Sequence, residues 1–294
     1  MRLLITGAWS EAEKYIDEIK QRGHAVVFMQ WEKDELPVEP DWVEGVIGNG
    51  LFLYHPLSLF SNLRYIQLTS AGFDRVDMAE VEKRNIEIHN AKGVYSVPMA
   101  EFAVCGVLQI YKQSRYFFSN QKEHKWQKHR GLRELTGKTV CVVGCGSVGR
   151  ECAKRFSAFG CKLTGVDLFP CTGEIFSQVF LPDQFNQAIA EADVVIFTLP
   201  LTRQTQHLID ETRFRSFKKD AILVNLSRGG LIASEVLEKN IDKIGGAVLD
   251  VFEDEPLNEN SLLWDHDHVI VTPHNSFIGE GNGERLKQVI LSRL

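Results

Sequence analysis

The feature that most constrains the fold is a glycine-rich turn between an apolar run and a helical pattern. The run at 139–143 is predicted to be a strand, and it leads directly into Gly144, Gly146 and Gly149, which have the spacing G-x-G-x-x-G. Apolar residues then recur at helical spacing until Gly160. A strand, a glycine turn and a helix in this order predict a site for the phosphates of a dinucleotide.

Each glycine has a reason to be there. Gly144 permits the tight turn, Gly146 lets the backbone approach a pyrophosphate closely, and Gly149 lets the helix pack against the strand. The backbone N–H groups of the first helical turn, around Ser147 and Val148, would face the phosphates, because they have no partner inside the helix.

An acidic residue at the end of the next predicted strand supports this interpretation. Asp167 lies 23 residues after Gly144, close to the roughly 20 residues typical of dinucleotide sites. A carboxylate there can accept hydrogen bonds from the ribose hydroxyls and would repel a 2′-phosphate. Leu168, Phe169 and Pro170 follow, with no Arg or Lys. We therefore expect NAD rather than NADP; the alternative is a structural turn with a surface aspartate.

The remaining pattern is typical of an α/β protein, in which short apolar runs alternate with amphipathic stretches. A helix is expected at 11–22, with Ser10 as its N-cap, a buried helix at 98–111, and a last helix at 283–294. Segment 116–130 is expected to be an exposed arm. Strands are expected at 2–6, 25–30, 43–47, 64–68 and 86–89, and six more at 139–143, 162–166, 194–199, 221–225, 246–251 and 268–272.

Composition excludes several other classes. A chain of 294 residues is long enough for about two domains, and its net charge of −6 argues against a nucleic-acid partner. No apolar run approaches the length of a membrane span, and the N-terminal apolar stretch is too short for a signal peptide. The six cysteines contain no C-x-x-C pair. We expect reduced thiols in a cytoplasmic protein rather than disulfides or a metal site.

Three polar residues follow predicted strands, at the sheet edge where open α/β proteins bind ligands. Arg228 could bind a carboxylate with two hydrogen bonds, and His274 could exchange a proton near neutral pH. Glu255 lies in an acidic loop after the strand predicted at 246–251. Taken singly, each is also explained as a surface arginine, a loop histidine or a solvated acid.

Together these stretches resemble the D-isomer-specific 2-hydroxyacid dehydrogenases. The resemblance covers nearly the whole chain and is specific because its motifs occur in the family's order. They lie at 70–77, 99–103, 135–139, 198–202, 225–229, 249–256 and 272–274.

The resemblance implies an α/β fold of two similar doubly wound domains. A Rossmann cofactor domain at 97–275 would be inserted into a flavodoxin-like substrate domain formed by 1–96 and 276–294. It also implies a homodimer, with the arm at 116–130 as the contact.

Roles for individual residues follow from the resemblance too. Arg228 would bind the carboxylate and carbonyl of a 2-keto acid. His274 would donate a proton to the carbonyl oxygen, and Glu255 would hold that histidine protonated. The remaining implied contacts are the amides near Ala71 and Gly72 on the substrate carboxylate, Pro200 at the cofactor, and Asp250 on the nicotinamide carboxamide.

The sequence also departs from the family. Asn275 follows the histidine where many relatives carry an aliphatic residue, and the last helix stops early, so we expect closure of the substrate domain to be less well secured. Between Gly45 and Leu63 there is no Lys or Arg. Relatives with phosphorylated substrates use basic groups there, so we expect an unphosphorylated acid such as hydroxypyruvate or glyoxylate.

Two alternatives keep this fold: an NADH-sensing, corepressor-like binding protein, and an enzyme for an inorganic or one-carbon substrate. Other candidates are weaker. The run 265–268, with two histidines and two aspartates, fits a solvated turn better than a metal site. His55 could line a substrate cleft. Trp126 and the phenylalanines at 117–118 are expected at a subunit interface.

Overall fold

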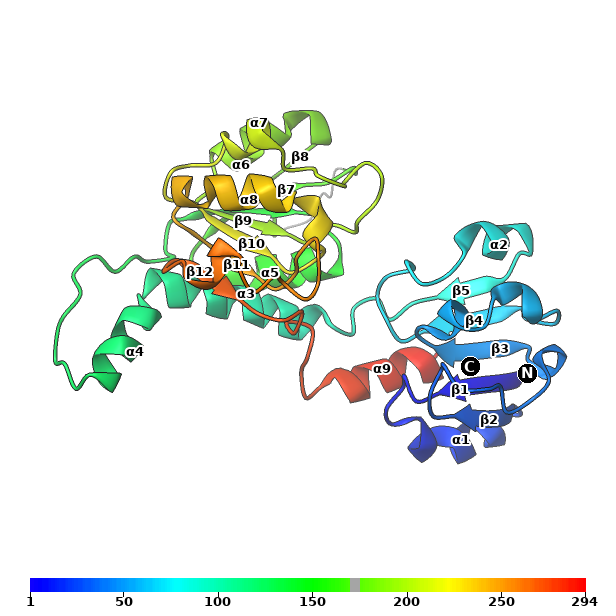
Figure 1. The fold of residues 1–294 in the computed structure, drawn as a ribbon. Helices are drawn as coiled ribbons and strands as arrows, with labels where there is room; N and C mark the ends of the chain where they lie inside the picture. The colour runs from blue at the N-terminus through cyan, green and yellow to red at the C-terminus, as the bar shows by residue number, and fades with distance from the viewer. Residues whose placement is uncertain (170–174) are drawn as a thin grey trace. The chain divides into compact units, whose positions relative to one another are not determined.

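The computed structural model describes residues 1–169 and 175–294. Pro170 and Cys171, which enter the sequence arguments above, lie outside the described residues. By their internal contacts the residues form two compact units, Met1–Tyr95 with Gly279–Leu294 and Ser96–Ile278. Each unit has a parallel sheet with helices, as Figure 1 shows. The division into a substrate domain at 1–96 with 276–294 and a cofactor domain at 97–275 remains a prediction.

The first unit has a five-stranded parallel sheet in the order β2-β1-β3-β4-β5, which is the order of flavodoxin-like folds. Its helices are α1 (Ile16–Gln21), α2 (Met78–Lys83) and α9 (Asn282–Leu291). The strands are β1 (Arg2–Thr6), β2 (Ala25–Met29), β3 (Gly45–Gly48), β4 (Tyr65–Leu68) and β5 (Glu87–His89).

The central strand shows why this sheet is covered on both faces. Side chains alternate along β1, so Leu4 enters one apolar core while Leu3 and Ile5 enter the other. The first core is closed by Val81 of α2, and the second by α1 and α9. A strand buried on both sides reads as a continuous apolar run, which is the pattern at 2–6.

The second unit has a seven-stranded parallel sheet in the order β12-β11-β10-β9-β6-β7-β8. Counted from β6, this is the doubly wound order of dinucleotide-binding folds with one further strand. The strands are β6 (Thr139–Val143), β7 (Lys162–Val166), β8 (Gln178–Phe180), β9 (Val194–Phe197), β10 (Ile222–Asn225), β11 (Gly246–Leu249) and β12 (Val269–Val271).

Helices cover both faces of this sheet as well. On one face, α3 and α5 pack through residues such as Val107 and Phe156; on the other, α6, α7 and α8 pack through Ile189, Phe214 and Leu237. The helices are α3 (Ser96–Tyr111), α4 (Ser114–Lys122), α5 (Ser147–Ala158), α6 (Phe185–Ala190), α7 (Glu211–Phe214) and α8 (Ser234–Asn240).

The predicted fold class is confirmed, with local corrections. The sheet of the second unit has a seventh strand, β8, which has only three residues and was missed. The first seven residues of the expected arm, 116–122, lie in helix α4. The helix expected at 11–22 begins as a 3-10 turn, Ala12–Tyr15, whose N-cap is Glu11 rather than Ser10. In the described part of the chain, no helix has the length and apolar character needed to cross a bilayer.

Candidate active site

The glycine turn begins where β6 ends, and two of its glycines are required by the backbone. Gly144 has φ +101°, a conformation that favours glycine. A Cβ on Gly149 would lie 2.1 Å from the carbonyl oxygen of Gly144, so only glycine lets the helix approach the strand this closely. At Gly146, by contrast, a Cβ would meet no atom within 4 Å. The turn is therefore tight on its inner side and open at Gly146.

Helix α5 starts at this open point with unpaired backbone donors. Gly146 is its N-cap and provides no side-chain cap, and the first intrahelical bond runs from Arg150 N to Gly146 O at 2.9 Å. The N–H groups of Ser147, Val148 and Gly149 precede that bond and have no partner within the helix. Together with the helix dipole, they make the start of α5 suited to an anionic group.

Asp167 is fixed beside the turn. Its Oδ2 accepts a hydrogen bond from the backbone N–H of Cys145 at 2.7 Å, and its Oδ1 accepts one from that of Phe169 at 3.2 Å. A carboxylate has about four acceptor positions, so it can still accept hydrogen bonds from two neighbouring hydroxyls. Leu168 and Phe169, both 73% exposed, follow it.

The adjacent strand β9 completes this edge. Thr198 follows β9 and donates from Oγ1 to the carbonyl oxygen of Gly144 at 2.6 Å. Pro200 lies exposed in the same segment, and its carbonyl accepts from Thr205 Oγ1 at 2.7 Å. The chain leaves β6 and β9 toward opposite faces of the sheet, and open α/β folds bind ligands at such a switch point.

His274 and Glu255 are in direct contact. Nδ1 of His274 lies 2.9 Å from Oε2 of Glu255, and Oε1 of Glu255 accepts the backbone N–H of Phe252 at 3.1 Å. An ionised carboxylate only accepts, so the Nδ1–H donates and Nε2 is the nitrogen left to exchange a proton. The two side chains are 41% and 38% exposed, and are thus accessible in this unit.

The turn that carries His274 is held by a buried aspartate. Asp250 directly follows β11 and is fully buried. Its Oδ1 accepts from Thr272 Oγ1 at 2.6 Å and from the Asn275 N–H at 2.8 Å, and its Oδ2 accepts from the Ser276 N–H at 2.8 Å. His274 itself has φ +51° and donates its N–H to the Asp250 carbonyl. Asp250 thus fixes the turn on both sides of the histidine, which the sequence did not predict.

Arg228 lies on the turn after β10, against the loop that leads to Glu255. Its Nη1 donates to the Ser227 carbonyl at 2.8 Å, and its own carbonyl accepts from Asn225 Nδ2 at 3.0 Å. A Cβ on the next residue, Gly229, would lie 1.8 Å from the carbonyl carbon of Phe252. The two segments are therefore packed backbone against backbone, and the glycine after Arg228 is required for that approach.

These three residues thus follow the neighbouring strands β10, β11 and β12 at one edge of the sheet. Gly229 lets the turn of Arg228 pack against the loop that leads to Glu255, and Asp250 holds the turn that carries His274. Neither positioning role was predicted from the sequence, although a buried strand that ends in an aspartate was a usable signal.

Ala71 and Gly72 lie in the other unit, after β4. The carbonyl of Ala71 accepts from Asn90 Nδ2 at 2.6 Å, and that of Gly72 accepts from Ser70 Oγ at 3.1 Å. Because Ala91 also donates its N–H to the Ser70 carbonyl at 2.8 Å, the loop is fixed against the segment after β5.

The weaker candidates have other partners. Nε2 of His266 pairs with Asp242 at 2.8 Å, and Nε2 of His55 lies 2.9 Å from the Asp34 carbonyl oxygen. Within residues 1–169 and 175–294, no three His, Cys, Asp or Glu side chains gather as metal ligands would. Cys141 and Cys152 are buried, and burial raises the pKa of both thiols to about 12.

Residues 104–276 match the family model described as "D-isomer specific 2-hydroxyacid dehydrogenase, NAD binding domain". The chain therefore belongs to the D-isomer specific 2-hydroxyacid dehydrogenase family and contains its NAD-binding domain. The resemblance drawn from the sequence is confirmed.

Two curated relatives are each 35% identical to this chain over 72% of its length. One is a glyoxylate reductase of Thermofilum pendens and the other a D-3-phosphoglycerate dehydrogenase of Methanocaldococcus jannaschii. The matched regions span 65% and 41% of those proteins, less than two thirds of their lengths.

A solved structure shares the fold over almost the entire chain. It is a D-isomer specific 2-hydroxyacid dehydrogenase family protein from Aeromonas salmonicida, with a TM-score of 0.86 and 28% identity over 99% of this chain and 94% of that one. These comparisons give the corepressor interpretation no support.

Proposed function

We propose that this protein is an oxidoreductase that transfers a hydride between NAD(H) and a small unphosphorylated 2-hydroxy or 2-keto acid, such as hydroxypyruvate or glyoxylate. The observation that carries the proposal is the contact between His274 and Glu255 at the edge of the sheet that also bears the glycine turn. A histidine paired with a carboxylate at a dinucleotide site is the arrangement that acid–base catalysis beside a cofactor requires.

The residues at the glycine turn fit a dinucleotide. The open space at Gly146 admits a pyrophosphate that any side chain would crowd, and the uncapped N–H groups of Ser147, Val148 and Gly149 would bind it. Asp167 would accept the adenosine ribose hydroxyls and disfavour a 2′-phosphate. Pro200 would contact the nicotinamide end. The carboxamide contact that the resemblance implies for Asp250 conflicts with the full burial of its side chain and its hydrogen bonds to Thr272, Asn275 and Ser276, so we assign Asp250 to holding the turn of His274.

When NADH is bound, the chemistry that it supplies is a hydride for the carbonyl carbon of the keto acid. His274 then donates the proton from Nε2 to the carbonyl oxygen, and in the oxidation direction it takes that proton back. Glu255 accepts from Nδ1 and so holds the ring in place with Nε2 as the nitrogen that exchanges the proton. Arg228 binds the substrate carboxylate and stabilises the charge that develops on the oxygen.

We extend this proposal to the two parts of the chain. Residues 97–275 form the cofactor domain, and residues 1–96 with 276–294 form the substrate domain, where the amides near Ala71 and Gly72 bind the carboxylate. An unphosphorylated substrate is supported by the lack of Lys and Arg between Gly45 and Leu63. The name of the Methanocaldococcus relative makes a phosphorylated acid the alternative to test.

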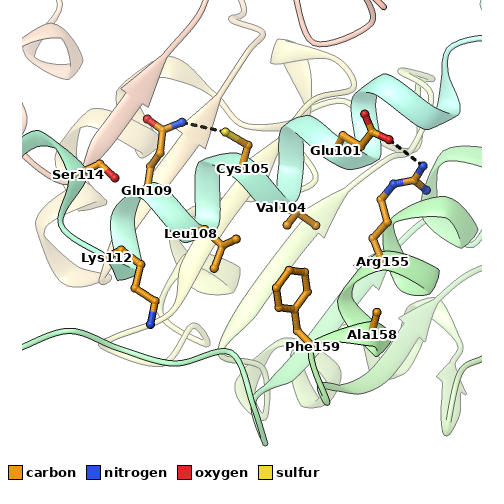
Figure 2. Close-up of a pocket in the computed structure, with 10 residues that line it drawn as sticks. All are labelled: Glu101, Val104, Cys105, Leu108, Gln109, Lys112, Ser114, Arg155, Ala158 and Phe159. Atoms are coloured by element: carbon orange, nitrogen blue, oxygen red, sulfur yellow. Dashed lines mark hydrogen bonds and ion pairs between the residues drawn. The ribbon is translucent and has the colours of Figure 1, made fainter. Parts of the chain in front are cut away.

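We also propose a cytoplasmic homodimer without a nucleic-acid or membrane partner. Helices α3 and α5 form a groove of about 640 Å³ whose walls include Val104, Leu108 and Phe159 (Figure 2). Beyond α4, Trp126 is 100% exposed. A monomer that exposes apolar surface in this way commonly buries it in an interface, and the arm at 116–130 of a second copy is our proposed occupant.

The central experiment is NADH oxidation, followed by absorbance, against glyoxylate, hydroxypyruvate, pyruvate and phosphohydroxypyruvate, with NADPH in parallel. We expect saturable turnover of an unphosphorylated keto acid with NADH. Tight NADH binding without turnover of any acid would favour the sensing alternative, and NAD reduction by formate or phosphite would favour the one-carbon or inorganic alternative.

A further inference from the structure

An acidic side chain ties together three strand ends at the carboxyl edge of the first unit's sheet. Glu32 comes shortly after β2. Its Oε1 accepts from Thr6 Oγ1, at the end of β1, at 2.8 Å and from the Asn49 N–H, just after β3, at 2.6 Å. Its Oε2 accepts from the N–H of Gly50 at 2.7 Å. Two successive backbone donors therefore bind one carboxylate of the same chain.

Two glycines allow this close approach. A Cβ on Gly48 would lie 2.7 Å from Oε1 of Glu32, and one on Gly50 would lie 3.3 Å from Oε2. Successive N–H groups that converge from a turn form an anion-binding concavity. Here the concavity already holds an anion, Glu32, so its donors are not available to an anionic group of a ligand.

This concavity adjoins the loop that we propose binds the substrate carboxylate. The Thr69 N–H donates to the Gly48 carbonyl at 2.8 Å, and Ala71 and Gly72 follow two and three residues later on the same loop. Arg75 also reaches this point, because its Cδ lies 3.9 Å from where a Cβ of Gly50 would be. Glu32 and the Arg75 side chain therefore both lie near Gly50, and the carboxylate places there a negative charge that would repel a phosphate.

We propose that Glu32 is a specificity-determining residue. Its carboxylate occupies the N–H donors of Asn49 and Gly50. It thereby excludes 2-keto acids whose distal group is a phosphate and admits those whose distal group is neutral, such as hydroxypyruvate. This inference rests on the proposed function. The lack of Lys and Arg between Gly45 and Leu63 was the earlier reason to expect an unphosphorylated substrate. Glu32 gives a second reason, and it lies outside that segment.

The test compares kcat/KM for phosphohydroxypyruvate and hydroxypyruvate, with NADH, in the full chain. Glu32→Ala empties the concavity, and we expect the ratio of phosphorylated to unphosphorylated substrate to rise at least about tenfold, because a charge-assisted hydrogen bond and a like-charge repulsion both change. Glu32→Gln removes the charge but keeps one acceptor, so we expect a rise of about threefold. Glu35→Ala, at an exposed acid nearby, is the matched control and should leave the ratio unchanged.

Inorganic phosphate gives a second readout. Glu32→Ala should become sensitive to competitive inhibition by millimolar phosphate during hydroxypyruvate reduction, while the unmodified protein should not. General damage to the loop would lower kcat/KM for both substrates alike, and it would leave their ratio and the sensitivity to phosphate unchanged.

The outcomes separate this inference from the proposed function. Turnover of hydroxypyruvate with an unchanged ratio in both Glu32 variants would overturn the role of Glu32 and leave the function standing. An unmodified protein that already prefers phosphohydroxypyruvate would overturn both the role of Glu32 and the unphosphorylated substrate class, while the hydride transfer itself would stand. An unmodified protein that reduces neither acid with NADH would overturn both.

Discussion

The carboxyl edges of the two sheets differ in what their backbone donors bind. In the second unit, β6 leads through the glycine turn into the twelve-residue helix α5, whose first turn has no side-chain cap and opens at Gly146. In the first unit, β1 is followed by a 3-10 turn, and the nearby donors of Asn49 and Gly50 are held by Glu32. Both sheets are doubly wound, yet the donors of Asn49 and Gly50 are filled by a carboxylate of the chain, whereas those at the start of α5 are open to an anionic ligand.

Strand order alone therefore does not create a dinucleotide site. The order brings loops to one edge, but the glycines and the caps decide whether the donors there are open or filled. If the cofactor binds and the reaction occurs at the open edge of the second unit, substitutions at that edge should alter cofactor binding or turnover.

The largest effect is expected at His274. His274→Gln removes the side chain that exchanges the proton, so kcat for keto acid reduction should fall at least about a hundredfold, the lower range for acid–base catalysis. NADH affinity, measured by fluorescence titration, should change little. His266→Gln, at a histidine paired with Asp242, is the control. Near-normal rates for His274→Gln would show that the proton comes from elsewhere.

A smaller loss is expected at the glycine behind Arg228. Gly229→Ala places a methyl group 1.8 Å from the Phe252 backbone, so the loop that leads to Glu255 must move. We expect kcat/KM to fall by at least about tenfold and stability by about 1–3 kcal/mol, the usual cost of overpacking. Gly230→Ala is the matched control, since its Cβ would meet only the Leu201 side chain, at 3.1 Å. Equal effects at both positions would contradict this account of the packing.

The open glycine should affect binding but not folding. A Cβ at Gly146 meets nothing within 4 Å in the protein, so Gly146→Ala should leave the melting temperature unchanged. It should weaken NADH binding by about tenfold, because the methyl group occupies space that a pyrophosphate needs. In Gly149→Ala the Cβ would lie 2.1 Å from the Gly144 carbonyl oxygen, so here the melting temperature should fall as well. Undiminished NADH affinity in Gly146→Ala would place the cofactor elsewhere.

Sequence patterns predicted the regular part of this molecule well. Buried parallel strands are continuous apolar runs, so β1, β6 and β7 were located to the residue and the other predicted strands to within two residues at each end. Strand β8 was missed because three residues carry no usable pattern, and α4 because an exposed helix shows no apolar period. At the site, sequence identified His274 and Glu255 as a pair only through the family resemblance.

The contacts that shape both edges could not be predicted in the same way. Asp250 binds residues more than twenty positions away, and Glu32 reaches donors 17 and 18 positions away. Such hydrogen bonds depend on which strands become neighbours, and no local pattern records them. The close approach of Gly229 to Phe252 is hidden for the same reason.

The smallest effect is expected at Asp167, which tests how the open edge selects its cofactor. Asp167→Ser removes the charge that would repel a 2′-phosphate, and a serine can still accept a hydrogen bond. We expect kcat/KM with NADPH, relative to NADH, to rise about three- to tenfold, since no Arg or Lys at 168–169 attracts the phosphate. Asp193→Ser is a poor control because that residue accepts the Thr139 N–H, whereas Asp183→Ser, at an exposed position, is suitable. An unmodified protein that already uses NADPH as well as NADH would show that Asp167 does not face the ribose, and the open edge would then bind its dinucleotide in another register.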